Sequence, residues 1–160
     1  MATTPAAFCN HDHHACASQV LARADARARA EGLRLTAVRR RVLEILASGH
    51  RALGAYEVLD QLALDGGKRQ PPVAYRALDY LVKHGFAHRI QALNAFAACT
   101  EATPDHIPAF FICDTCQSVA ETPVRAVGQA MEDAAGRIGF AMEAMNLEAV
   151  GQCPACEGAQ

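Results

Sequence analysis

The chain has 160 residues, of which 51% are hydrophobic, a size that suits one ordinary domain or two small ones. It contains no run of 18 apolar residues and no basic start followed by an apolar stretch, so we expect no membrane span, no secretory signal and a cytoplasmic location. The net charge of -2 hides a division, because residues 1–90 carry 13 Lys or Arg against 8 Asp or Glu, whereas residues 91–160 carry 2 against 9. This asymmetry predicts a basic module, able to bind a polyanion, joined to an acidic one.

Residues 1–18 are interpreted as a flexible tail. The segment is dense in side chains that can bind metal, so a transient or additional zinc site there stays an open alternative. These side chains are Cys9, His11, His13, His14 and Cys16. From residue 19 to residue 33 the chain is rich in Ala and Arg with no breaker before Gly32, which predicts a first helix.

Three more helices are predicted before Gly85. The second has Thr36 as its expected N-cap, ends at Gly49, and carries an apolar face at helical spacing. That face consists of Val38, Val42, Ile45 and Leu46. The third helix spans residues 54–67. The fourth begins at Pro71-Pro72 and has an inward face of Ala74, Ala77, Leu78 and Leu81, opposite a quadrant formed by Tyr75, Arg76, Asp79 and Lys83.

The next segment, up to residue 99, predicts two short strands around a turn near Asn94. Three helices, a fourth helix with an exposed polar quadrant and then a hairpin form the order of a winged helix-turn-helix module, whose last helix enters the major groove of DNA. We therefore predict a DNA-binding domain over residues 19–99 and a hinge loop over residues 100–108.

Residues 109–160 predict a second, mixed α/β unit, which makes the whole chain α+β. Strands are expected at 109–113, at 118–121 and over most of 140–153, with a helix at 122–139 between the last two. The expected buried stripe of that helix is Val124, Val127, Met131 and Ala134.

Two CxxC steps lie in this second unit, with 36 residues between them. Two such knuckles together supply the four thiolates of a tetrahedral zinc site, and a site without a vacant position is structural. The ligands would be Cys113, Cys116, Cys153 and Cys156. The alternative is a thiol oxidoreductase, but a redox CxxC follows a strand and opens a helix, whereas the first step here lies between two strands and has a twin. We see no enzyme motif and expect no catalytic activity and no small-molecule substrate.

The order of these motifs resembles the ferric uptake regulator family and, within it, the zinc uptake regulators. The resemblance is carried by LRLTAVRRRVLEIL, PPVAYRALDYLVKHGFAHRI, AFFICDTC and CPAC, and it covers residues 19–156. It implies a homodimer, an α/β dimerisation domain over residues 109–160, and repression of transcription when metal is bound. The His-rich stretch that iron-sensing members carry before the first CxxC is reduced here to His106, which favours the zinc branch. An iron or peroxide sensor of the same family is the alternative.

The resemblance also implies functional residues. It implies a second, regulatory zinc site, whose two imidazoles, one thiolate and one carboxylate suit tetrahedral coordination. Its ligands would be His88, Cys99, His106 and Glu121, which gives two zinc ions per chain. Tyr75 and Arg76 match the base-contacting pair of the family, and a dimer favours an approximately palindromic double-stranded operator. Phosphate contacts are expected from Arg39, Arg40, Arg41, Lys68 and Arg69.

Overall fold

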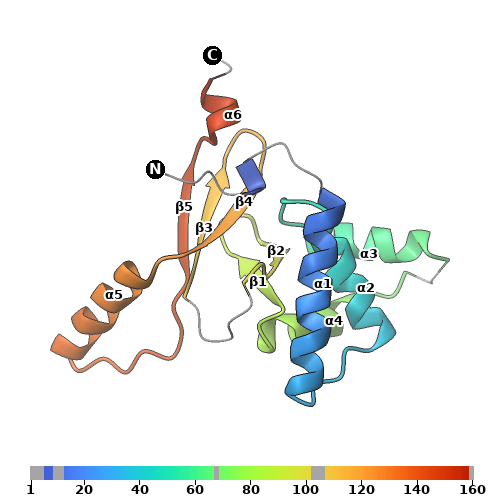
Figure 1. Ribbon diagram of the computed structural model, residues 1–160, viewed down its shortest axis with the longest axis horizontal. Helices are drawn as coiled ribbons and strands as arrows, with labels where there is room; N and C mark the ends of the chain where they lie inside the picture. The colour runs from blue at the N-terminus through green and yellow to red at the C-terminus, as the bar shows by residue number, and fades with distance from the viewer. Residues whose placement is uncertain (1–5, 9–12, 67–68, 102–106, 159–160) are drawn as a thin grey trace.

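The computed structural model describes residues 6–8, 13–66, 69–101 and 107–158. Helices α1 to α4 lie on one side of the molecule, α5 lies on the other, and the strands lie between them (Figure 1). None of the described helices has the length and apolar character that a membrane crossing requires.

Helix α1 spans His13–Ala30 and therefore begins earlier than the sequence predicted. The flexible tail assigned to residues 1–18 is too long, because residues 13–18 belong to this helix. The segment has no Gly or Pro to stop a helix, and Ser18 Oγ donates a hydrogen bond to the His14 carbonyl oxygen at 2.8 Å. The His and Cys content of residues 13–18 suggested a flexible tail. That content, however, does not prevent these residues from being helical. Cys9 and His11 lie outside the described residues.

The next three helices follow the predicted order. They are α2 (Ala37–Ala47), α3 (Ala55–Leu64) and α4 (Pro71–Lys83). Thr36 caps α2 as predicted, since its Oγ1 accepts a hydrogen bond from the Arg39 amide at 3.4 Å. The inward face predicted for α4 is buried throughout. Val38 is the one wrong member of the face predicted for α2, because its side chain is 40% exposed.

The hairpin pairs β1 (Ala87–Ile90) with β2 (Ala95–Ala98) in antiparallel register. Its turn contains Asn94 with a φ of 47°, a left-handed conformation that Asn tolerates. Helices α2 to α4 followed by this hairpin form a winged helix-turn-helix, so the predicted fold class is confirmed.

The second unit is a three-stranded sheet in the order β4-β3-β5. Strand β3 (Pro108–Cys113) pairs antiparallel with β4 (Val119–Pro123) and parallel with β5 (Leu147–Gly151). Only residues 147–151 of the strand predicted over 140–153 pair with a neighbour. The residues before them bring the chain from the end of α5 back to the beginning of β3, where Leu147 stands opposite Ala109, as a parallel pairing requires. The short helix α6 (Pro154–Glu157) follows.

Helix α5 (Arg125–Arg137) extends away from the sheet (Figure 1). The buried stripe predicted for it is wrong for the isolated chain, because Val127 is 50% and Met131 46% exposed. The helix contacts its own chain at Gly128, where an added Cβ would come within 2.3 Å of Ile107 Cδ1. Helix α5 is amphipathic as expected, but no segment among the described residues covers its apolar stripe.

The hairpin is docked on the sheet, which joins the two units. A shared core contains Ile90 and Ala95 of the hairpin with Phe110 and Ile112 of β3. The loop after α2 adds a backbone contact, since the Val119 amide of β4 donates to the His50 carbonyl oxygen at 2.7 Å.

Glu148 of β5 anchors the turn of the hairpin. Its two carboxylate oxygens accept hydrogen bonds from the backbone amides of Gln91 at 2.7 Å and Ala92 at 2.8 Å. Burial acts to raise the pKa of Glu148, but these bonds and one from Asn146 outweigh it, so its pKa lies below its usual range.

Replacing Glu148 by Gln should weaken this anchor by about 1 to 2 kcal/mol, because a neutral amide accepts less strongly and offers one acceptor oxygen in place of two. A carboxylate with a lowered pKa contributes stability above its unfolded-state pKa and loses it as the pH falls through the folded value. The difference in urea midpoint between wild type and Glu148→Gln should therefore be constant above about pH 5 and shrink below it. Glu143→Gln, at an exposed glutamate of the same connection, is the control; an equal loss in both variants would contradict the anchor.

Candidate metal sites and nucleic-acid surface

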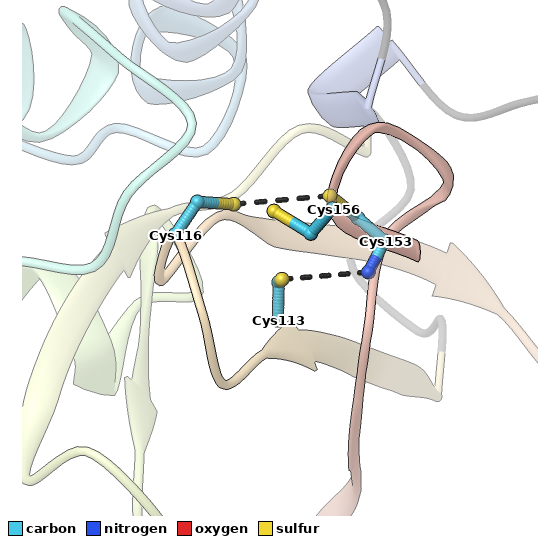
Figure 2. A group of neighbouring side chains, drawn as sticks. All are labelled: Cys113, Cys116, Cys153 and Cys156. Atoms are coloured by element: carbon cyan, nitrogen blue, oxygen red, sulfur yellow. Dashed lines mark hydrogen bonds between the residues drawn. The ribbon is translucent and has the colours of Figure 1, made fainter. Parts of the chain in front are cut away.

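The four predicted thiol ligands meet at one end of the sheet. Cys113 ends β3, Cys116 lies in the turn to β4, Cys153 directly precedes α6 and Cys156 lies within it. All four Sγ atoms lie within 4.8 Å of one another, and Figure 2 shows the side chains turned toward a common centre. The Cys116 and Cys153 sulfurs are 3.8 Å apart. The sequence spacing thus corresponds to one compact cluster.

The surroundings of this cluster favour thiolates. The Cys153 amide donates to Cys113 Sγ at 3.4 Å. Hydrogen bonds from the backbone of Cys116, and then of Cys153, lower the pKa of Cys113 to about 6. In contrast, a hydrogen bond with Cys153 raises the pKa of Cys156 to about 12. One thiol of the cluster therefore ionises readily while another resists ionisation, so full deprotonation of the set calls for a cation, and four soft donors fit zinc.

A second cluster lies where the hairpin meets the sheet. It contains His88 of β1, Cys99 directly after β2 and Glu121 of β4, whose ligand atoms all lie within 4.8 Å of one another. His88 Nε2 is 3.1 Å and Cys99 Sγ 3.8 Å from the same oxygen, Glu121 Oε1. Three of the four regulatory ligands predicted from the sequence are thus together, and His106 lies outside the described residues.

Thr100 orients the carboxylate of this second cluster. Its backbone amide and its hydroxyl donate to Glu121 Oε2 at 2.7 Å and 2.8 Å, which leaves Oε1 directed at His88 and Cys99. This is the role of a supporting residue around metal ligands. Thr100 was not among the residues predicted from the sequence, although its position beside Cys99 was an available signal.

The surroundings of the second cluster oppose ionisation of its thiol. Burial, and then the negative charge of Glu121, raise the pKa of Cys99 to about 12. A divalent cation would compensate both the carboxylate and a deprotonated thiol, so the donor set fits zinc as well. Because His88 and Cys99 belong to the hairpin and Glu121 to the sheet, an ion here would join the two units.

The outer face of α4 is open to solvent. Tyr75 is 42% exposed, and Arg76, Asp79 and Lys83 are exposed beside it, as the helical spacing predicted. Arg76 makes no ion pair with any residue that the structure describes. A free guanidinium on a recognition helix can donate as a fork to guanine O6 and N7.

The arginines expected to contact phosphate already have intramolecular partners. Arg40 pairs with Asp25 at 3.2 Å and with Glu44, and Arg41 donates to both carboxylate oxygens of Asp65 at 2.6 Å and 3.0 Å. Arg39 stacks on the Tyr80 ring, with its Cζ 3.4 Å from the centroid, and Arg69 pairs with Asp60. Lys68 lies outside the described residues. Apart from Glu44, which lies four residues after Arg40 on the same helix, the acidic partners come from other segments, so the sequence could not show these pairings. Each arginine must exchange a partner to reach DNA.

Together, a winged helix-turn-helix and an α/β unit with two metal-ligand clusters define a class of metal-binding, DNA-binding regulators. The sequence model of the Ferric uptake regulator family matches residues 30–150, and the chain belongs to this family. The "Zinc uptake regulation protein" of Escherichia coli (strain K12) is 36% identical over 139 residues, which cover 86% of this chain and 81% of the relative.

Two solved structures support the zinc branch. The structure described as a zinc uptake regulator complexed with zinc and DNA is 35% identical, with a TM-score of 0.84 over 89% of this chain and 95% of that one. The crystal structure of holo XcZur is 40% identical, with a TM-score of 0.79 over 89% of this chain and 99% of that one. The resemblance stated from the sequence is therefore confirmed.

Proposed function

We propose that the protein is a zinc-responsive repressor that binds operator DNA as a homodimer and controls genes of zinc uptake. The observation that carries this proposal is the His88, Cys99 and Glu121 cluster, because it spans the hairpin of the DNA-binding domain and the sheet of the second unit. The similarity to zinc uptake regulators, one of them described with zinc and DNA, supports zinc as the metal.

Two zinc ions per chain fit the proposal. The four-cysteine cluster holds the structural ion, and its closed thiolate shell leaves no position for exchange or chemistry. The second cluster holds the regulatory ion, with His106 as its fourth ligand. It offers fewer thiolates than the first, which suits an ion that must bind and leave as the zinc level changes.

Zinc at the second cluster would fix the angle between the hairpin and the sheet. In a dimer this angle sets how the two α4 helices are presented to successive major grooves. Zinc then stabilises the conformer that binds DNA, and by linkage operator DNA raises zinc affinity by the same factor.

The second copy would cover the apolar surface of the C-terminal unit. Several large apolar side chains of this unit are exposed, although a monomer rarely leaves such a group uncovered. They are Phe111, Val127, Met131, Ile138, Phe140 and Val150. The stripe predicted as buried on α5 belongs to this group, so its burial is expected in the dimer.

The proposal is tested with DNA selected from a random library by the zinc-loaded protein. We expect an inverted repeat, bound in a mobility-shift titration when free zinc is buffered at low concentration, and not when ferrous, manganese or nickel ions replace it. A response to ferrous ion alone would favour an iron sensor. Dithiol exchange activity without sequence-specific binding would favour the oxidoreductase alternative. As an operator-binding regulator, the protein would act in the cytoplasm and need no catalytic activity.

Replacing Arg76 by Ala should weaken binding to the selected operator by about 1 to 3 kcal/mol and relax the base preference at one position in each half-site. The measurement is a titration against the operator and its single-base variants at fixed salt. Arg137→Ala is the matched control, because it removes the same charge from the exposed end of α5 in the second unit. Equal losses in both variants would show a general charge effect and exclude base readout by Arg76.

A further inference from the structure

A third group of metal-binding side chains lies at the start of α1. His13 and Cys16 are three residues apart on this helix and so share one face. His50, in the loop between α2 and α3, lies against His13, with the two ring centroids 5.2 Å apart. Cys16 and His50 also line the same cavity, whose volume is about 230 Å³. Three residues of ligand type from two distant segments therefore converge outside the two clusters described above.

We propose that His13, Cys16 and His50 bind a third zinc ion. Two imidazoles coordinated to one tetrahedral zinc have their ring centroids about 5 Å apart, which is the separation found here. Cys16 is half-buried and supplies the thiolate, so the described residues provide three of the four tetrahedral positions. The ligand atoms are less closely gathered than in the other two clusters, so the side chains must turn onto the ion. His13 is exposed at the beginning of its helix and can make this rotation.

An ion at this site would stiffen the junction between the DNA-binding domain and the sheet. The His50 carbonyl oxygen accepts a hydrogen bond from the Val119 amide of β4 at 2.7 Å, and Glu121 follows two residues later on the same strand. An ion held by His13, Cys16 and His50 ties α1 to the loop that rests on β4. It therefore stiffens the same junction that the His88, Cys99 and Glu121 cluster spans.

The third site should be the weakest of the three. Among the described residues it has three ligands, of which one is a thiolate, and His13 is exposed, so it offers less charge and less shielding from water than the others. It would fill only after the structural and regulatory sites. The inference concerns metal binding alone and does not depend on DNA binding by the protein.

The first test counts zinc ions on the full-length chain. Wild-type protein is titrated with zinc against a chromophoric chelator, and the bound ions are counted by native mass spectrometry. We expect three per chain in the wild type and one fewer in Cys16→Ser and in His50→Gln, which keeps the backbone carbonyl. His84→Gln, at a histidine packed against Tyr80, is the control and should keep all three.

The second test locates the ion at Cys16. A metal-bound thiolate is a poor nucleophile, so filling the third site should slow alkylation of Cys16 by iodoacetamide about tenfold or more, measured by peptide mass mapping. His13→Gln should abolish this protection. The proposal is overturned if the wild type binds no more zinc than Cys16→Ser, or if zinc leaves the alkylation rate of Cys16 unchanged. Failure to bind operator DNA would affect neither measurement.

Discussion

Replacing Cys153 by Ser is expected to remove the ion of the four-cysteine site and to unfold the end of the sheet. Structural zinc contributes about 10 to 16 kcal/mol in small zinc-dependent folds, which is comparable to the whole stability of a domain. Cys153 lies where β5 meets α6, so loss of its thiolate breaks the four-ligand shell at the point that ties this end of the chain to β3. Zinc content and thermal unfolding measure the effect, and dimer formation should fail with it.

Cys99→Ser is the matched control for this experiment, because it removes a buried thiol without touching the four-cysteine cluster. It should keep the structural ion and a cooperative melting transition. The assignment of the four cysteines as a structural site would be wrong if Cys153→Ser retained full zinc content and the melting curve of the wild type.

The second large effect is on regulation. Cys99→Ser should fold and dimerise, yet lose the gain in operator affinity that zinc provides, a coupling of about 5- to 150-fold in typical allosteric proteins. The reason is that the remaining ligands lack the one thiolate that favours zinc over harder ions. Mobility-shift titrations over a series of buffered zinc concentrations give the measurement.

Thr100→Val should perturb the same site as Cys99→Ser, but with a smaller effect. It keeps every proposed ligand and removes only the hydroxyl that donates to Glu121 Oε2 at 2.8 Å. Loss of such a supporting contact typically weakens metal binding by about 10- to 100-fold, so the zinc response should shift to higher concentration and persist. Normal zinc sensitivity in Cys99→Ser would place the sensor elsewhere in the chain.

Features that depend on neighbouring residues could be predicted from the sequence. The cap at Thr36 and the inward face of α4 follow from local spacing, and both are confirmed. The two CxxC steps also predicted that the four thiols lie close together, because two such steps typically form one zinc site.

Features that depend on distant partners could not be predicted. Helical periodicity correctly marked the apolar stripe of α5, but whether its own chain or a second copy covers that stripe is a tertiary property. The same limit applies to Arg40 and Arg41, whose partners Asp25 and Asp65 lie on or beside other helices. The convergence of His13 and His50 likewise needed the fold, since nothing in the sequence relates these two segments.

The parallel pairing of β3 with β5 has a kinetic consequence. The pairing of β5 with β3 closes a long loop that contains β4 and α5, and such long-range contacts form slowly. A slip of one residue would move Cys153 away from Cys113, which now stands opposite Gly151, and would turn the faces of β5 over. Under the proposed assignment, zinc would bind only the alignment that gathers four sulfurs, and it would therefore select the correct strand register during folding. The yield of correctly folded protein should therefore itself depend on zinc, before any question of operator occupancy arises.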